Sequence, residues 1–202
     1  MSFWLPSLRT NTGRILPALA ILILGLFPVH ALAQAGEDML SQREVDSLRD
    51  AAFVPMERIL VFEQILNDRQ KRLENLQAKR RGHTDFAAEM HDVVEQFGAI
   101  TDELNDNLDE YSRKHRDIRK ALPKLIEATE RWSTALRTPA EAEGYAVVRR
   151  IALDNVKDAR ELAQTLQTDL DTYFKAHPDA EQAEKKRNAD PHAVHGEDAK
   201  PQ

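Results

Sequence analysis

The fold of this chain is decided by the stretch from Asp85 to Arg137, which reads DFAAEMHDVVEQFGAITDELNDNLDEYSRKHRDIRKALPKLIEATERWSTALR. Large apolar side chains recur there at every seventh position: Met90, Phe97, Leu104, Tyr111, Ile118, Leu125 and Trp132. A seven-residue spacing keeps one stripe of a helix in register with partner helices that supercoil around it. The stripe predicts one very long helix over 85–137. Because its phase continues past Pro123, we interpret this proline as a kink within that helix.

The residues before this stretch predict a first helix over 41–81. Ser41 and Glu44 have the spacing of a capping box, in which the two side chains satisfy free backbone N–H groups at a helix start. Apolar residues follow at spacings of three and four. Pro55 interrupts them, and since proline removes a helical hydrogen bond we expect a kink or break near 52–54. Gly82 supplies the stop signal.

The residues after it predict a third helix over 139–176. Thr138 and Glu141 form a second capping box with a proline between them in the favoured first helical position. The apolar residues again recur at three and four, and Ile151 is one of several that widen the stripe. Beyond it, residues 178–202 are mostly alanine, charged residues and histidine. That composition cannot bury enough surface to order itself, so we expect a disordered charged tail.

Short turns at 82–84 and 137–139 make the three predicted helices antiparallel neighbours. The expected fold class is therefore all-α, an elongated antiparallel three-helix bundle or coiled coil over 41–177, with kinks near Pro55 and Pro123. Helices of unequal length leave apolar flanks at both ends of such a bundle. A protein partner or a second copy of the chain, as in a homodimer, would cover them.

The N-terminus has the pattern of a secretory signal peptide over 1–33. Arg9 and Arg14 precede the apolar run 15–29, which is followed by small residues that suit cleavage after Ala33 or after Ala35. The run is shorter than the roughly 20 apolar residues of a spanning helix, so an uncleaved anchor is the weaker interpretation. We expect a periplasmic or secreted protein without a stable membrane anchor, whose short N-terminal lead runs to residue 40.

Composition excludes several kinds of chemistry. The chain has no cysteine, which rules out disulfides, thiolate metal sites, covalent haem attachment through cysteine and a cysteine nucleophile. Its formal net charge of −6 becomes −8 once the predicted signal is removed, because that segment holds two arginines and no acid. Such a balance argues against binding to nucleic acid, where Lys and Arg neutralise phosphates. Phosphate loops, nucleophile elbows and dinucleotide fingerprints are absent, so no catalytic residue is predicted.

Two functional hypotheses follow. The first is an exported non-enzymatic protein that acts by protein–protein interaction, as a scaffold or in a chaperone-like way, with no cofactor and no metal site. The alternative is a haem- or metal-binding bundle. Its candidate ligands are His115, on the apolar stripe, with Met90 or His91. For Met90 and His91 the preferred interpretation is core packing of the methionine and a surface position for the histidine, without a ligand.

Overall fold

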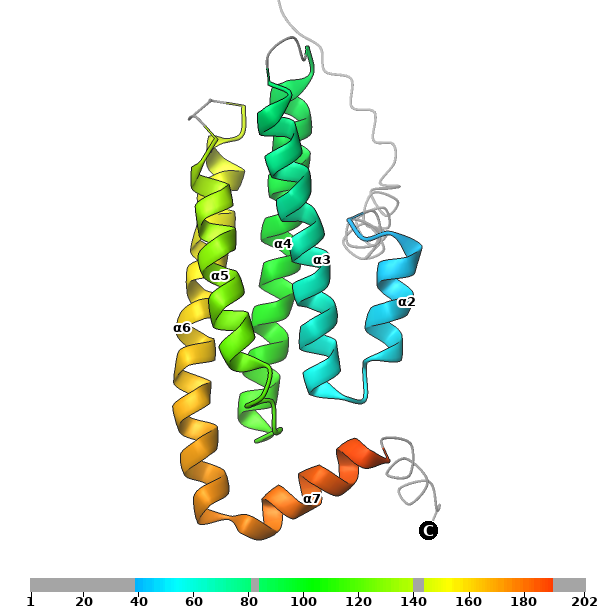
Figure 1. Ribbon diagram of the computed structural model, residues 1–202, viewed down its shortest axis with the longest axis vertical. Helices are drawn as coiled ribbons and strands as arrows, with labels where there is room; N and C mark the ends of the chain where they lie inside the picture. The colour runs from blue at the N-terminus through cyan, green and yellow to red at the C-terminus, as the bar shows by residue number, and fades with distance from the viewer. Residues whose placement is uncertain (1–38, 81–83, 140–143, 191–202) are drawn as a thin grey trace, which may run out of the picture. The chain divides into compact units, whose positions relative to one another are not determined.

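The computed structural model describes residues 39–80, 84–139 and 144–190. Helices make up most of this part of the chain, and no strand occurs in it. In order they are α2 (Gln42–Asp50), α3 (Pro55–Ala78), α4 (Phe86–Arg113), α5 (Leu122–Arg137), α6 (Ala146–Ala176) and α7 (Pro178–Ala189) (Figure 1). The predicted all-α fold class is confirmed. The predicted signal peptide over 1–33 lies outside the described residues.

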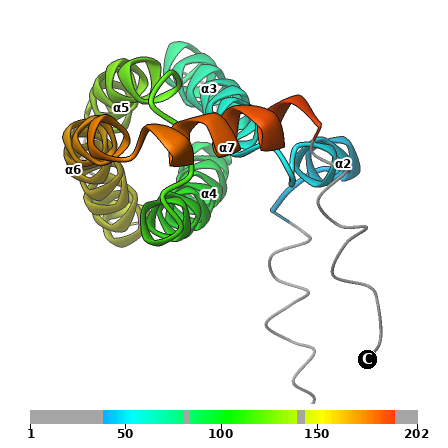
Figure 2. The ribbon, with the colours of Figure 1, turned by 90° about the horizontal axis from the view of Figure 1, so that it is seen from below.

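Helices α3, α4, α5 and α6 form a four-helix bundle. Helix α4 packs against α3 and α6, and α5 packs against the same two helices from the other side. Consecutive helices run in opposite directions, and Figure 2 shows the four of them around a common centre. The expected three-helix arrangement is therefore wrong in helix number, although the antiparallel bundle itself is present.

The difference arises at residues 114–121. The chain reverses direction there, so the expected long helix is divided into α4 and α5. Helix α4 ends in a Schellman motif, in which His115 adopts the left-handed conformation with φ 47°. The His115 N–H donates to the Ser112 carbonyl at 3.1 Å, and the Arg116 N–H donates to the Tyr111 carbonyl at 2.9 Å. Glycine usually occupies this left-handed position, so a histidine there carries no stop signal in the sequence. Pro123 accordingly belongs to the first turn of α5 and kinks no helix.

The heptad stripe nevertheless identifies the core. All seven of its residues are buried, including Tyr111 at the end of α4, Ile118 in the turn and Leu125 in α5. Phe97 and Trp132 meet edge to face, with ring centroids 5.9 Å apart and an interplanar angle of 76°. The stripe keeps its phase through the reversal because α4 and α5 turn their apolar faces toward the same centre.

The expected first helix is divided at its proline. Helix α2 begins after Ser41, whose capping box with Glu44 is formed: the Ser41 N–H donates to the Glu44 carboxylate at 2.7 Å. Residues 51–54 are not helical, and Pro55 is the first residue of α3. Helix α2 packs against α3. The proline thus separates two helices, which is the break that the sequence allowed near 52–54.

The expected disordered tail is wrong for residues 178–189, which form α7. His177 joins it to α6, and its single buried side chain is that of Glu184. Its apolar contact with the core is limited to the partly buried Ala180, and its main contacts are ion pairs, as described below. Composition could not show this, because the partners lie on the turn between α4 and α5, more than 60 positions earlier in the chain. Residues 191–202 lie outside the described part.

Helices α4 and α6 approach closely through small residues. A Cβ placed on Gly98 would lie 3.5 Å from the Ala152 Cα, which is van der Waals contact, so the two helices are about as close as an alanine at this position would allow. Two asparagines join the backbones: Asn155 Nδ2 donates to the Gly98 carbonyl at 3.0 Å, and Asn105 Nδ2 donates to the Asn155 carbonyl at 3.0 Å. This contact sets the rotation of α6, which turns its alanines inward and leaves other side chains on the outer face.

Candidate interaction surface

Two adjacent aliphatic side chains are exposed at the beginning of α6. Val147 is 60% exposed and Ile151 is 50% exposed, the highest values among the large exposed hydrophobic residues of the described chain. Residues four apart lie side by side on a helix surface, so the two form one apolar spot. The sequence placed Ile151 on the buried stripe. That assignment is wrong, because the close contact between α4 and α6 turns Ala152 toward the core and Ile151 outward.

Arginine and lysine lie along one side of this apolar spot. A surface hollow of about 470 Å³ lies beside it, between the end of α5 and the start of α6. Its lining is Arg137, Ala146, Val147, Arg149, Arg150, Leu153, Asp154 and Lys157. Four of these residues are basic and one is acidic, in a chain whose net charge is negative. We call Val147, Ile151, Arg137 and Arg150 the α6 patch.

The first turn of α6 departs from the usual rules for helix starts. It contains no acidic residue, and Tyr145 at the N-cap makes no side-chain capping hydrogen bond. Arg149 and Arg150 instead add positive charge where the helix dipole is already positive. Arg149 is held by the Pro139 carbonyl. The side chains of Arg137 and Arg150 form no ion pair within the described residues.

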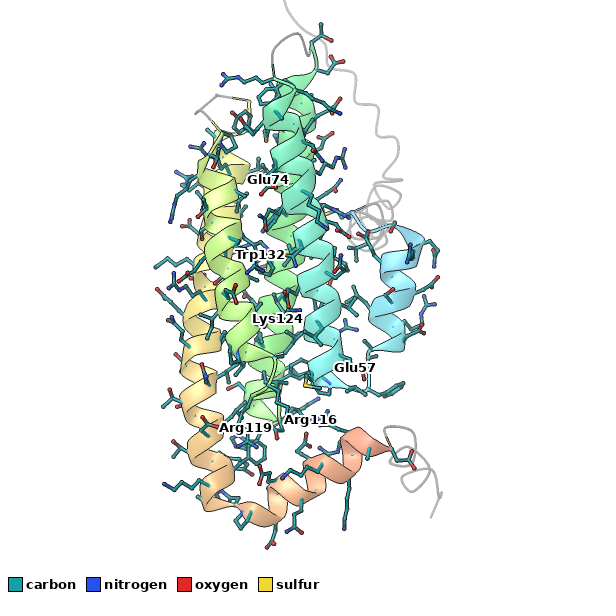
Figure 3. The ribbon with its side chains drawn as sticks, in the orientation of Figure 1. Glu57, Glu74, Arg116, Arg119, Lys124 and Trp132 are labelled. Carbon is teal, nitrogen blue, oxygen red and sulfur yellow. The ribbon has the colours of Figure 1, made fainter. Side chains whose placement is uncertain are left out.

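A group of polar side chains lies at the seam where α3 packs against α5. Glu63 is buried at 2% exposure, and Lys124 Nζ lies 3.3 Å from its carboxylate. Asn67 donates to the same carboxylate at 3.5 Å and accepts a hydrogen bond from Trp132 Nε1 at 2.9 Å. Figure 3 shows Lys124 and Trp132 along this seam, with Glu74 further up α3. Within the described residues Glu63 Oε2 itself accepts no hydrogen bond, so its charge is balanced through the ion pair with Lys124. The contacts of Lys124 and Trp132 join α5 to α3 at this level.

Further along the same seam lies a hollow of about 550 Å³. Its lining is Gln70, Glu74, Gln77, Glu130, Arg131, Thr134, Ala135 and Thr138, of which only Ala135 is apolar. No large exposed hydrophobic side chain of the described residues lines this hollow, whereas Val147 lines the one beside α6. Burial of large apolar side chains drives most protein association. The α6 patch is therefore the better candidate for an interaction surface.

A buried ion pair docks α7 onto the turn between α4 and α5. The Glu184 carboxylate, 5% exposed, lies 2.9 Å from Arg116 Nε and also pairs with Arg187. The Asp117 backbone N–H donates to the same carboxylate at 3.3 Å. Because Glu184 is the only buried side chain of α7, this pair is the centre of the contact.

Arg119 forms the second part of this contact. Its guanidinium donates to Asp117 at 2.8 Å and to Glu181 of α7 at 2.6 Å, and it lies 4.6 Å from the centre of the Phe174 ring. Figure 3 shows Arg116 and Arg119 at the end of the bundle beside α7. The hydrogen bond from Arg119 lowers the pKa of Asp117 against the opposing effect of burial. A hydrogen bond from the same guanidinium lowers the pKa of Glu181.

These lowered pKa values predict that acid releases α7. A carboxyl whose pKa is lower in the folded state stabilises that state above its unfolded pKa, about 4, and loses the contribution as the pH falls through its folded pKa. In a titration from pH 7 to pH 2, the amide resonances of residues 178–189 should therefore shift below about pH 4, before the core of the bundle melts. Resonances of α7 that stay unchanged until the whole bundle unfolds would contradict this electrostatic docking.

The candidate ligands of the alternative hypothesis do not converge. Met90 is fully buried in α4, while His91 is partly exposed, with Nδ1 3.6 Å from Asp92 and 4.0 Å from Glu95. His115 lies beyond the other end of α4. Twenty-five positions separate it from Met90, or roughly 37 Å along a helix. No group of three His, Cys, Asp or Glu side chains in residues 39–80, 84–139 and 144–190 could hold a metal ion.

His115 has a packing role at the far end of the bundle. Its ring stacks on Tyr173 at a centroid distance of 3.9 Å, and the other neighbour of Tyr173 is His177, whose ring lies 4.4 Å from it. The histidine thus joins the turn after α4 to the end of α6. Its stripe position in the sequence does not place it in the core, because α4 ends at Arg113 and His115 is exposed.

Two further findings concern the length and polarity of the helices and the similarity of this chain to known proteins. In the described residues, every helix is too short or too polar to cross a bilayer. Neither family models nor curated proteins nor solved structures give a match to this chain.

Proposed function

We propose that this is an exported, non-enzymatic helical-bundle protein that acts by binding another polypeptide through the α6 patch, as a scaffold or in a chaperone-like way. The observation that carries the proposal is the pair Val147 and Ile151, exposed side by side next to a group of basic side chains. Export rests on the signal-peptide pattern at residues 1–33. The alternative, a haem- or metal-binding bundle, has no support from the positions of His115, Met90 and His91.

The chemistry of the patch is that of a protein interface. Full burial of a valine or isoleucine side chain is worth about 1.5–3 kcal/mol relative to exposure, so the pair supplies a useful part of a binding free energy. Arginine is enriched at interfaces, where its fork of donors meets carboxylates or carbonyl oxygens. Apolar side chains bordered by charged ones are also common at interfaces.

Native mass spectrometry of the mature protein, purified gently from the extracytoplasmic fraction of its host, tests the proposal. We expect a bound polypeptide or a homo-oligomer of defined mass. The double substitution Val147→Ser and Ile151→Ser should remove it. Both positions are exposed, so the melting temperature should hardly change, with an expected free-energy effect within about 0.5 kcal/mol.

Photo-crosslinking locates the contact independently. A photoreactive residue at position 151 should give a crosslinked polypeptide adduct, whereas one at Thr165, also exposed on α6, should not. The proposed function fails if position 151 gives no adduct and the native mass is that of a bare monomer. A stoichiometric cofactor or metal mass would instead favour the alternative.

A further inference from the structure

The outer face of α6 carries both signs of charge along its length. Val147, Ile151, Asp154 and Asp158 follow one another at spacings of four, three and four and are all exposed, so they share one face of the helix. Arg150 and Lys157 flank this line. The face is basic and apolar at its beginning and becomes acidic within two turns. The side chains of Arg150, Asp154 and Asp158 form no ion pair within the described residues.

Such a face is complementary to itself when reversed. In an antiparallel pair of α6 helices, the basic beginning of each helix meets the acidic part of the other, whereas a parallel pair would bring like charges together. We therefore propose that the occupant of the α6 patch is the same face of a second copy of this chain, related by a twofold axis. This inference rests on the proposed function and names its partner.

The side chains define a register for this pairing. With the twofold axis at the level of residue 152, Arg150 of one copy lies level with Asp154 of the other, and the reciprocal pair forms by symmetry. Ile151 then lies next to its counterpart beside the axis. Val147 falls level with the aliphatic stem of Lys157 of the second copy, which can cover it while the ammonium group stays in water. Every exposed apolar side chain of the patch thus gains an apolar neighbour.

Self-complementarity favours a second copy over an unrelated acidic partner. An acidic helix would match Arg137 and Arg150, but it would meet Asp154 and Asp158 on the same face, where like charges repel. A twofold contact pairs the basic part of the face with the acidic part of the second copy. The assembly stops at two copies, because both patches are then occupied. We therefore expect a dimer that does not grow into larger assemblies.

Charge exchange tests this pairing in the mature full-length protein. Sedimentation velocity over a range of protein concentrations should show a monomer–dimer equilibrium. Arg150→Glu alone and Asp154→Arg alone should each weaken the dimer at least about tenfold, because each creates two like-charge contacts per dimer. The combination of both substitutions restores opposite charges, so it should return the dissociation constant to within a few-fold of the original. Ile151→Glu should abolish the dimer.

Two controls separate association from folding. Thr165→Glu, an exposed change on α6 outside the proposed register, should leave the dimer unaffected. All the variants should keep the melting temperature of the unmodified monomer, since every substituted side chain is exposed. Added salt should weaken the dimer, because exposed ion pairs are screened.

The possible failures are distinguishable from failure of the proposed function. A protein that stays monomeric while position 151 crosslinks to a different polypeptide would overturn the second-copy inference and keep the proposed function. A dimer that is insensitive to Arg150→Glu, Asp154→Arg and Ile151→Glu would also overturn the inference, because its contact would lie elsewhere. A monomer without any adduct at position 151 would overturn both.

Discussion

Phe97→Asp should leave the chain without a cooperative thermal transition. Phe97 is fully buried at the centre of α4, and its ring packs edge to face on Trp132 of α5. Loss of a buried phenylalanine costs about 3–5 kcal/mol, and a buried carboxylate without a partner adds a large further penalty. The sum equals or exceeds the roughly 5–15 kcal/mol that stabilises an ordinary domain. Far-UV circular dichroism during heating measures the outcome directly.

Ala99→Asp is the matched control for this prediction. Ala99 lies two positions further along the same helix and is exposed, so the same new charge should change the free energy of unfolding by no more than about 0.5 kcal/mol. Leu104→Asp, one heptad beyond Phe97 and also fully buried, should behave like Phe97→Asp. Normal helicity and normal melting in both buried variants would show that the stripe is not the core.

Glu184→Ala should release α7 from the bundle while the four-helix core stays folded. The substitution removes the only buried side chain of α7 and leaves the Arg116 guanidinium, whose side chain is 16% exposed, without its carboxylate. Breaking a buried pair by removing one partner costs about 3–5 kcal/mol. Hydrogen exchange of residues 178–189 at neutral pH should accelerate on the order of 100-fold, which corresponds to about 3 kcal/mol.

Gln182→Ala serves as the control, because Gln182 is exposed on the same helix and should leave exchange unchanged. Replacing Arg116 by Met together with Glu184→Leu should recover much of the protection, since apolar side chains of similar volume can replace a buried ion pair without loss. Equal exchange rates in Glu184→Ala and in the unmodified protein would show that the ion pair does not hold α7 in place.

The interaction surface was the least predictable part of this molecule. The sequence gives no sign that Ile151 is exposed, because it recurs near the apolar spacing of its helix. Its direction depends on the rotation of α6, and that rotation follows from the contact of Gly98 with Ala152 on another helix. A signal was nevertheless present. The first five residues of α6 include two arginines and no acid, against the preference of a helix start, and such local conflicts are expected at functional sites.

By itself the sequence determined the buried stripe of residues 85–137 and the helical character of most of residues 41–176, but neither α7 nor the exposure of Ile151. The period of the stripe specifies one buried face, and burial of that face is favourable whatever the path of the chain, so all seven stripe residues are inside. Capping at Ser41 and the start of α3 at Pro55 are local effects of side-chain hydrogen bonding and of the proline ring, so the sequence was sufficient to predict them.

Only the tertiary structure decided the number of helices in the bundle and the place of α7. One long helix and two antiparallel helices joined by a turn bury the same stripe residues, so the periodicity of the stripe cannot distinguish them. The left-handed residue at the reversal is His115, which the stacking contact with Tyr173 helps to hold in place. Likewise α7 has no apolar face of its own and is ordered by Arg116 and Arg119 from the distant turn. Both features depend on contacts between residues far apart in the chain, which no local pattern records.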